Sequence, residues 1–302
     1  MELPTRHTMK RYRVLAYDFD TRANILNTDI KNDWEPQAKA QWENNKNQIK
    51  EGLIAEFGAY SAFDKILNFT DLGAYPISII AFHNKFLHQA RRAFVIGAYY
   101  PALTSACALG ERILNQLVLH LRDYFKATPE YKNVYRKNSF DDWDLAINTL
   151  AAWQILLPDV VVLFRELKEI RHRSIHFNPE TDTNDRELSL NAMLKLSKII
   201  QKQFSAFGTQ PWFIEGIPGA AYIKRESQDD PFVKEIVLPN CYLVGHLHTL
   251  ENSPKGWVVH DNHEYESGEI SDQEFAELLK NRGKTPAPNK ANSADAKSRA
   301  AD

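Results

Sequence analysis

Apolar residues at helical spacing dominate the middle of this chain and limit it to a mainly helical fold. In the segment 101–125 they recur every three to four positions with some drift: Leu103, Leu109, Ile113, Leu117 and Leu121. The segment 185–207 has a similar apolar set: Leu188, Met193, Leu196, Ile199, Ile200 and Phe204. Such spacing places the apolar residues on one face of a helix. Several amphipathic helices with connections of modest length favour a bundle.

Proline and aspartate mark where other helices begin. Pro36 is tolerated in the first turn of a helix predicted over residues 34–57. Pro158 starts a helix that runs into the sequence RHRSIH, and Asp141 or Asp142 can cap the helix before it. These signals predict helices through most of the first two thirds of the chain.

The pattern differs near both ends. Residues 12–19 are aromatic and β-branched enough for a short strand, whereas residues 58–78 indicate a loop-rich connector. Beyond the helical region the sequence predicts short strands and one closing helix: strands over 220–227, 232–239, 241–250 and 256–262, and the helix over 271–282. We therefore expect a mainly α protein in four segments: an N-terminal strand and helix extension (1–80), a helical bundle (81–208), a small β-rich module with a closing helix (212–282), and a disordered tail (283–302) that has almost nothing to bury.

The composition, 43% hydrophobic and 25% charged, is that of an ordinary globular protein. With a net charge of −2, any nucleic-acid surface has to be a local patch. Cys107 and Cys241 lie far apart in apolar surroundings, which predicts two reduced core residues and fits a reducing cytosol. No apolar run is long enough for a membrane span, and no signal-type segment is present at the N-terminus. We expect a cytoplasmic protein with no membrane partner.

The helix that starts at Pro158 begins apolar and ends in a basic and titratable string: Arg171, His172, Arg173, Ser174, Ile175 and His176, with Asn178 close behind. A histidine, with a pKa of about 6.5, can act as base or acid at neutral pH. An arginine supplies a permanently charged, two-donor fork for phosphate. Arg171 and His176 thus offer what a metal-free ribonuclease needs: a base for the ribose 2′-OH and a cation for the transition state. His172 and Arg173 can add donors.

The string Arg171-His172-xxx-His176 resembles the R-x4-H signature of the HEPN superfamily, in which a polar residue commonly follows the arginine. The segment RRAFVIGAYYPALTSACALGERILN is similar to the paired N-terminal helices of that family, which a short break separates before a helix that bears an acidic residue. The resemblance covers roughly residues 82–207. The place of the motif at the end of a helix, in a helical unit, adds to its value.

The resemblance implies a HEPN-like bundle and a metal-independent endoribonuclease without a cofactor, acting in bacterial stress or antiphage defence. It also implies a homodimer in which both protomers contribute Arg171 and His176 to one site. Glu111, on the second helix, can orient or neutralise an arginine, as an acidic residue does in some relatives. The apolar helix pair over residues 94–114 also favours a dimer, because a thin bundle does not readily bury it. The alternative is a non-catalytic HEPN module that binds nucleotide or RNA, or mediates assembly.

The same residues also fit a zinc site or a purely structural helix end. His172 and His176 lie four residues apart on a helix, a spacing used for zinc, although the glutamate that a metalloprotease needs after the first histidine is absent. Basic residues also suit the negative end of a helix dipole, and the histidine can pack into the bundle. We expect no metal in this protein.

A loop over residues 126–140 mixes basic and aromatic side chains. Lys132, Arg136 and Lys137 alternate with Tyr131 and Tyr135. This mixture suits single-stranded RNA, through phosphate pairing and base stacking. An ordinary solvated loop is the alternative.

Two further groups have weaker chemical signatures. Asp18 and Asp20 follow a predicted strand like the aspartate pair of haloacid dehalogenase-like phosphatases, but the neighbouring residues and the βαβ pattern do not fit, so we expect a turn. Four histidines near the C-terminus are predicted to be half-exposed strand residues or, if they gather, metal ligands: His246 and His248 on one strand face, with His260 or His263.

Overall fold

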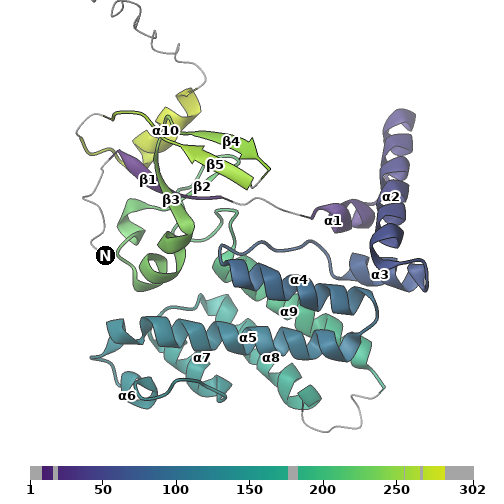
Figure 1. Cartoon of the computed structure of the whole chain (residues 1–302), viewed down its shortest axis with the longest axis horizontal. Coiled ribbons are helices and arrows are strands. Elements are labelled where there is room, and N and C mark those ends of the chain that lie inside the picture. Colours follow the sequence, from purple (N-terminus) through teal and green to yellow (C-terminus); the bar gives the residue numbers. More distant parts are fainter. Residues whose placement is uncertain (1–8, 16–19, 176–182, 255, 266–267, 283–302) are drawn as a thin grey trace, which may run out of the picture. The chain divides into compact units, whose positions relative to one another are not determined.

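The computed structural model describes residues 9–15, 20–175, 183–254, 256–265 and 268–282 (Figure 1). They belong to two compact units. The larger spans Tyr12–Leu243, and the smaller joins the residues up to Arg11 to those from Val244 onward. The prediction of a mainly helical protein with a small β-rich part near the C-terminus is confirmed. The predicted tail lies outside the described residues.

The bundle in the larger unit consists of long helices (Figure 1): α4 (Ala81–Val95), α5 (Tyr99–Leu121), α7 (Trp143–Ala152), α8 (Pro158–Ile175) and α9 (Asp185–Phe204). α5 is central because it packs against α4, α7, α8 and α9. The apolar stripe expected on α5 is buried along its length. As predicted, Asp142 caps α7, since its side chain accepts a hydrogen bond from the backbone N–H of Leu145 at 3.1 Å.

Gly110 allows two helices to approach α5 closely. A β-carbon at this position would lie 2.8 Å from Cη2 of Trp143 and 2.9 Å from Cδ2 of Leu167. These distances are shorter than van der Waals contact, so any larger residue would push α7 or α8 outward. The absence of a side chain here therefore lets the side chains of Trp143 and Leu167 lie against α5 next to Glu111.

The helix pair over residues 94–114 is buried mainly within the single chain. Its inward residues, such as Phe94, Leu103 and Cys107, are fully covered, while Ile96 and Tyr100 remain 55% and 52% exposed. The apolar residues of this helix pair therefore do not require a second protomer to cover them. The homodimer stays a prediction that rests on the family resemblance.

In the described part of the chain before the bundle lie α1 (Arg22–Asn27), α2 (Pro36–Phe57) and α3 (Ala62–Asp71). α2 begins at Pro36, in agreement with the sequence. The predicted connector over residues 58–78 is wrong, because α3 occupies half of it. Phe69 is buried, and the Asn68 amide donates to the carbonyl of Phe94 at 3.2 Å, so tertiary contacts hold this segment as a helix.

The loop predicted over residues 126–140 contains a short helix. η1 (Arg122–Phe125) is followed by α6 (Tyr131–Val134). The Arg122 guanidinium donates to the carbonyls of Val134 at 3.1 Å and Lys137 at 2.6 Å. Together with the burial of Val134, these bonds fix the backbone, and the prediction of a plain loop is wrong.

The strands that lie wholly or partly in the larger unit form one sheet in the order β2-β1-β3: β1 (Lys10–Val14), β2 (Ala221–Tyr222) and β3 (Cys241–Gly245). β1 and β2 are antiparallel, with Arg13 opposite Tyr222. A short 3-10 helix, η3 (Arg225–Ser227), follows β2.

The strand predicted over residues 232–239 is wrong. The segment forms a π-helix, η4 (Val233–Val237), and a 3-10 helix, η5 (Leu238–Asn240). The Asp230 side chain accepts a hydrogen bond from the backbone N–H of Val233 at 3.0 Å and so supports the first turn. Val233, Ile236 and Val237 are buried, a spacing that fits a helix better than a strand.

The smaller unit contains an antiparallel hairpin of β4 (Thr249–Ser253) and β5 (Gly256–His260), and the helix α10 (Asp272–Asn281). Ser271 and Glu274 form a capping box at the start of α10. Two N-terminal side chains also belong to this unit. Lys10 Nζ lies 2.8 Å from Asp261 Oδ2, and Arg11 Nε, in a side chain 1% exposed, lies 2.5 Å from Asp272 Oδ1.

The single strand predicted over residues 241–250 is interrupted after Gly245. The backbone N–H of Gly245 donates to Asp261 at 3.0 Å, and its carbonyl accepts from the backbone N–H of His248 at 3.3 Å. These bonds close a turn between β3 and β4. His246 and His248 therefore lie in a turn and do not alternate on one strand face, which corrects the prediction.

Candidate functional site

The predicted R-x4-H motif lies at the C-terminal end of α8. Arg171, His172 and Arg173 belong to the last turn of the helix, which ends at Ile175. His176 and Asn178 lie outside the described residues, so their positions stay predictions. His172 and Arg173 are exposed, whereas Ser174 is buried and donates its hydroxyl to the carbonyl of Ile170 at 2.7 Å.

Arg171 is held by groups from two other helices. Its Nη2 lies 3.0 Å from Oε2 of Glu111 on α5. The same carboxylate oxygen accepts a hydrogen bond from Nε1 of Trp143, the first residue of α7, at 3.1 Å. The guanidinium also lies over the Trp143 ring, 5.7 Å from its centroid. The structure thus brings Glu111 to the arginine, as the sequence predicts, and adds Trp143, which the sequence did not single out.

This arrangement holds Arg171 by contacts with two helices and leaves it partly accessible. The side chains of Arg171 and Glu111 are 27% and 34% exposed. A planar guanidinium has five N–H donors, and Glu111 takes only part of them. The remaining donors can pair with an anionic oxygen, such as that of a phosphate.

Cys107 lies on α5 one turn before Glu111, and its thiol is not suited to act as a nucleophile beside Arg171. Burial raises the pKa of its thiol to about 12, against a smaller opposing effect of the Arg171 charge. The thiol therefore stays protonated at neutral pH. Neither Cys107 nor Cys241 forms a disulfide, as predicted.

The basic and aromatic segment around α6 is exposed. The rings of Tyr131 and Tyr135 stack with centroids 5.6 Å apart, and the Arg136 guanidinium lies 4.9 Å from the Tyr135 centroid. Lys132, Arg136 and Lys137 are exposed, and no carboxylate of the described residues pairs with them. The segment therefore presents cations beside an aromatic platform.

Metal-type side chains do not gather in the described part of the chain, where no group of three or more His, Cys, Asp or Glu residues could hold an ion. The His248 ring is buried with Nδ1 2.6 Å from the Gly245 carbonyl, and His260 Nε2 lies 2.9 Å from Glu251. His246 and His263 both lie against the Tyr265 ring.

No helix among the described residues is both long and apolar enough to cross a membrane.

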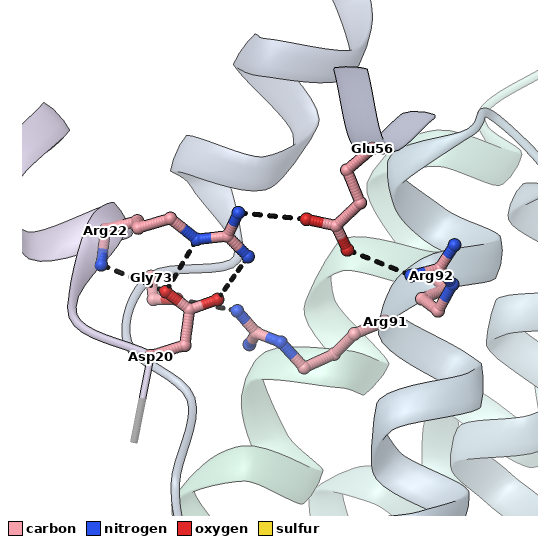
Figure 2. A network of polar contacts seen from close by, with 6 residues as sticks. All are labelled: Asp20, Arg22, Glu56, Gly73, Arg91 and Arg92. Atoms are coloured by element: carbon pink, nitrogen blue, oxygen red, sulfur yellow. Dashed lines mark hydrogen bonds and ion pairs between the residues drawn. The ribbon is translucent and has the colours of Figure 1, made fainter. Parts of the chain in front are cut away.

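The structure also contains a network of charged side chains that the sequence did not predict (Figure 2). The Asp20 carboxylate accepts hydrogen bonds from Nε and Nη2 of Arg22, at 3.0 and 2.7 Å. Glu56 on α2 joins Arg22 to Arg92 on α4, with both N–O distances at 2.9 Å. Figure 2 shows the Asp20 carboxylate between the guanidinium groups of Arg22 and Arg91.

Arg91 is the buried member of this network. Its side chain is 6% exposed and donates to the backbone carbonyls of Leu72 at 3.2 Å and Gly73 at 2.7 Å. Burial lowers the pKa of Arg91 to about 10, against the opposing charge of Asp20, so the group is still cationic at neutral pH. Burial acts to raise the pKa of Asp20, but hydrogen bonds from Arg22 hold it below its usual value. The carboxylates of Asp20 and Glu56 compensate most of the positive charge of the three arginines. Because the paired groups come from different helices, the network joins α1, α2 and α4.

No family model, curated protein or solved structure matches this chain.

Proposed function

We propose that the protein is a metal-independent endoribonuclease of the HEPN type. The observation that carries the proposal is the support of Arg171 by Glu111 and Trp143, at the end of the helix that bears the R-x4-H motif. A surface arginine that only terminates a helix needs no such support. An arginine that has to meet a phosphate in one orientation gains from it, because preorganised charge is what stabilises a transition state.

Each motif residue has a proposed role. His176 deprotonates the ribose 2′-OH or protonates the leaving 5′-oxygen, Arg171 stabilises the charge that develops on the phosphate, and His172 adds a polar contact. Arg173 and Asn178 support them. No metal or other cofactor enters this reaction. The resemblance to HEPN ribonucleases further supports a homodimer with both motifs at one site, in the cytoplasm, in bacterial stress or antiphage defence.

The α6 segment is proposed to bind the RNA strand. Tyr135 offers a face for a base, and Lys132, Arg136 and Lys137 offer charge to the phosphates. This contact depends on ionic strength, because cations released from RNA contribute to binding.

The test is cleavage of a mixed RNA pool by the purified protein in EDTA, with analysis of the product ends. We expect 2′,3′-cyclic phosphate and 5′-hydroxyl ends. Arg171→Ala should lower the rate by about 10²- to 10³-fold, the usual effect of removing one transition-state donor. Arg165→Ala is the matched control, because Arg165 lies on the same helix and its Nη2 donates to Asn148 at 3.1 Å on the surface, away from Glu111 and Trp143 in the contacts of the described residues.

Cleavage that stops in EDTA would contradict the proposal, and so would equal rates for Arg171→Ala and the unmodified protein. Failure of His176→Ala to slow the reaction would remove His176 from its role.

A second candidate function is favoured by the same salt bridge. Glu111 already neutralises Arg171, which suits a non-catalytic HEPN module that binds nucleotide or RNA or mediates assembly. In that case RNA should be retained in a mobility-shift experiment without being cut. Loss of retention in a Tyr135→Ala and Arg136→Ala double variant would then locate the binding surface.

A further inference from the structure

A small crevice opens between α4, α5 and η4, and none of its lining residues belongs to the charge network of Asp20, Arg22, Glu56, Arg91 and Arg92. Its volume is about 130 Å³. Its inner wall is apolar and buried: Ile113, Leu117, Phe204 and Ile236. One polar residue, His83 of α4, belongs to this inner wall, and its side chain is 1% exposed. A buried polar ring on an apolar wall needs hydrogen-bond partners, so the question is where its two nitrogens find them.

One nitrogen of His83 is satisfied and the other is not. Nδ1 lies 2.9 Å from Oγ of Ser78. Nε2 has no hydrogen-bond partner among the described residues. Ser78 does not line the crevice, so Nε2 is the nitrogen of His83 that is left for a molecule in the crevice. The rings of Phe82 and Phe204 pack edge-on beside it, with centroids 4.5 and 4.7 Å from that of His83.

The hydrogen bonds of Ser78 determine which nitrogen carries the proton. Its Oγ accepts from the backbone N–H of Ile80 at 3.1 Å, and Ser78 itself is 3% exposed. The hydroxyl proton therefore has His83 Nδ1 as its acceptor, since the opposite arrangement would leave a buried O–H without a partner. Nδ1 is then the acceptor and Nε2 carries hydrogen, so the nitrogen left without a partner is an N–H donor on a residue that lines the crevice.

This donor stays neutral. Burial lowers the pKa of His83 to about 3, so the ring carries no charge at physiological pH. The crevice therefore has no preference for an anion at its inner end. Polar side chains stand at its outer end, where Gln116, His120 and Asn240 are at least partly exposed.

We propose that this crevice binds a small neutral molecule with an apolar ring and a carbonyl-type acceptor, the acceptor taking the N–H of His83. The volume supports a single ring, because a dry apolar cavity of about 150 Å³ accommodates benzene in another protein. The single donor supports one acceptor atom, and the amides at the outer end suit a polar substituent. This site is independent of Arg171 and of ribonuclease activity.

The test uses the full-length protein labelled with ¹⁵N and two probes of similar size. Cyclohexanone has a ring and an acceptor, and cyclohexene has the ring alone. We expect the His83 spectrum of the free protein to show a proton on Nε2 and none on Nδ1. Cyclohexanone should shift the Nε2–H signal and bind several-fold, up to about tenfold, more tightly than cyclohexene, the ratio that one hydrogen bond supplies.

Two variants locate the effect. His83→Phe keeps a ring but removes the donor, so both probes should bind equally. His120→Phe changes a histidine at the outer end of the same crevice and should leave the preference for cyclohexanone intact. If His83→Phe does not fold, the two probes on the unmodified protein still decide the question.

Three results would overturn the proposal. A proton on Nδ1 of His83 would remove the donor. Equal affinities of the two probes for the unmodified protein would mean that the donor is not used. No change of the His83 signal with either probe would mean that the crevice holds water only.

Discussion

The Arg171 guanidinium and the Glu111 carboxylate form a salt bridge of 3.0 Å between α8 and α5, two helices separated in the chain by α6 and α7. Because the carboxylate occupies part of the arginine fork, a phosphate has to share or displace it. Trp143 favours sharing over displacement, since its indole N–H holds the same oxygen of Glu111 and so keeps the guanidinium in one orientation. The strength of the proposed phosphate contact therefore depends on an uncharged residue of α7.

We expect Trp143→Phe to weaken RNA cleavage because it removes the N–H that holds Glu111. Trp153→Phe is the control, since Trp153 Nε1 donates to Thr128 Oγ1 at 2.9 Å elsewhere in the bundle. Both rings are nearly buried, so each variant should lose on the order of 2 kcal/mol in urea unfolding. Only Trp143→Phe should lower the cleavage rate beyond the effect of lost stability. Equal rates for both variants would count against the role of Trp143.

Gly110→Ala should destabilise the protein by about 1–3 kcal/mol, because its β-carbon would meet Trp143 and Leu167 below 3 Å. Gly52→Ala is the matched substitution on α2, where nothing lies within 4 Å of the added carbon. That variant should instead gain about 0.5–1 kcal/mol from helix propensity. The two changes in the free energy of unfolding should thus have opposite signs.

Stability should fall as the pH is lowered from 7 to 5, partly because of His83. Its pKa is 6.5 in the unfolded chain and about 3 in the folded one, so in this range only the unfolded state takes up the proton. The contribution of neutral, buried His83 to the free energy of unfolding is complete above pH 6.5 and decreases as the pH falls toward 3. Between pH 7 and 5 the expected loss is about 2 kcal/mol. Urea unfolding of His83→Phe should show a dependence on pH that is weaker by this amount.

Two adjacent arginines should respond differently to replacement by methionine. Arg91→Met leaves the carbonyls of Leu72 and Gly73 without their donor in a buried position, so we expect a loss of about 2 kcal/mol. Arg92, 46% exposed, makes a surface ion pair with Glu56, and Arg92→Met should cost less than about 1 kcal/mol. An Arg91→Met protein as stable as the unmodified one would mean that the cost of burying this charge cancels its hydrogen bonds.

The helical core could be predicted because its signals are local. Proline at the start of α8, aspartate before α7 and the apolar spacing of α5 each act within a few residues. The strand predicted over residues 232–239 failed because β-branched residues also suit a buried helix when tertiary contacts favour it. α3 was also missed because distant contacts decide it. Asn68 donates to the carbonyl of Phe94 on α4, and the buried Phe69 ring lies beneath the Arg22 guanidinium of α1.

The candidate site could be predicted only where a motif names its residues. Arg171 and Glu111 were singled out from the resemblance, and their contact is present. Trp143 reaches that pair only because Gly110 lets α7 approach, which no spacing rule encodes. No sequence pattern predicts the salt bridges of Glu56 with Arg22 and Arg92 either, because they join three helices far apart in the sequence.

The smaller unit has a consequence for how the protein is made. The salt bridge of Arg11 can form only after Asp272, 261 positions further along the chain, has been synthesised. At about 5–20 residues per second, a ribosome needs on the order of 10–50 s to synthesise that length. Residues Tyr12–Leu243 of the larger unit, which include β2 and most of β3, emerge during this interval, so β1 can pair in its sheet before Asp272 has been synthesised. Nascent chains stalled before Asp272 should therefore contain the bundle and the β2-β1-β3 sheet but lack the salt bridge of Arg11, and proteases should cut them near Arg11 faster than the finished chain.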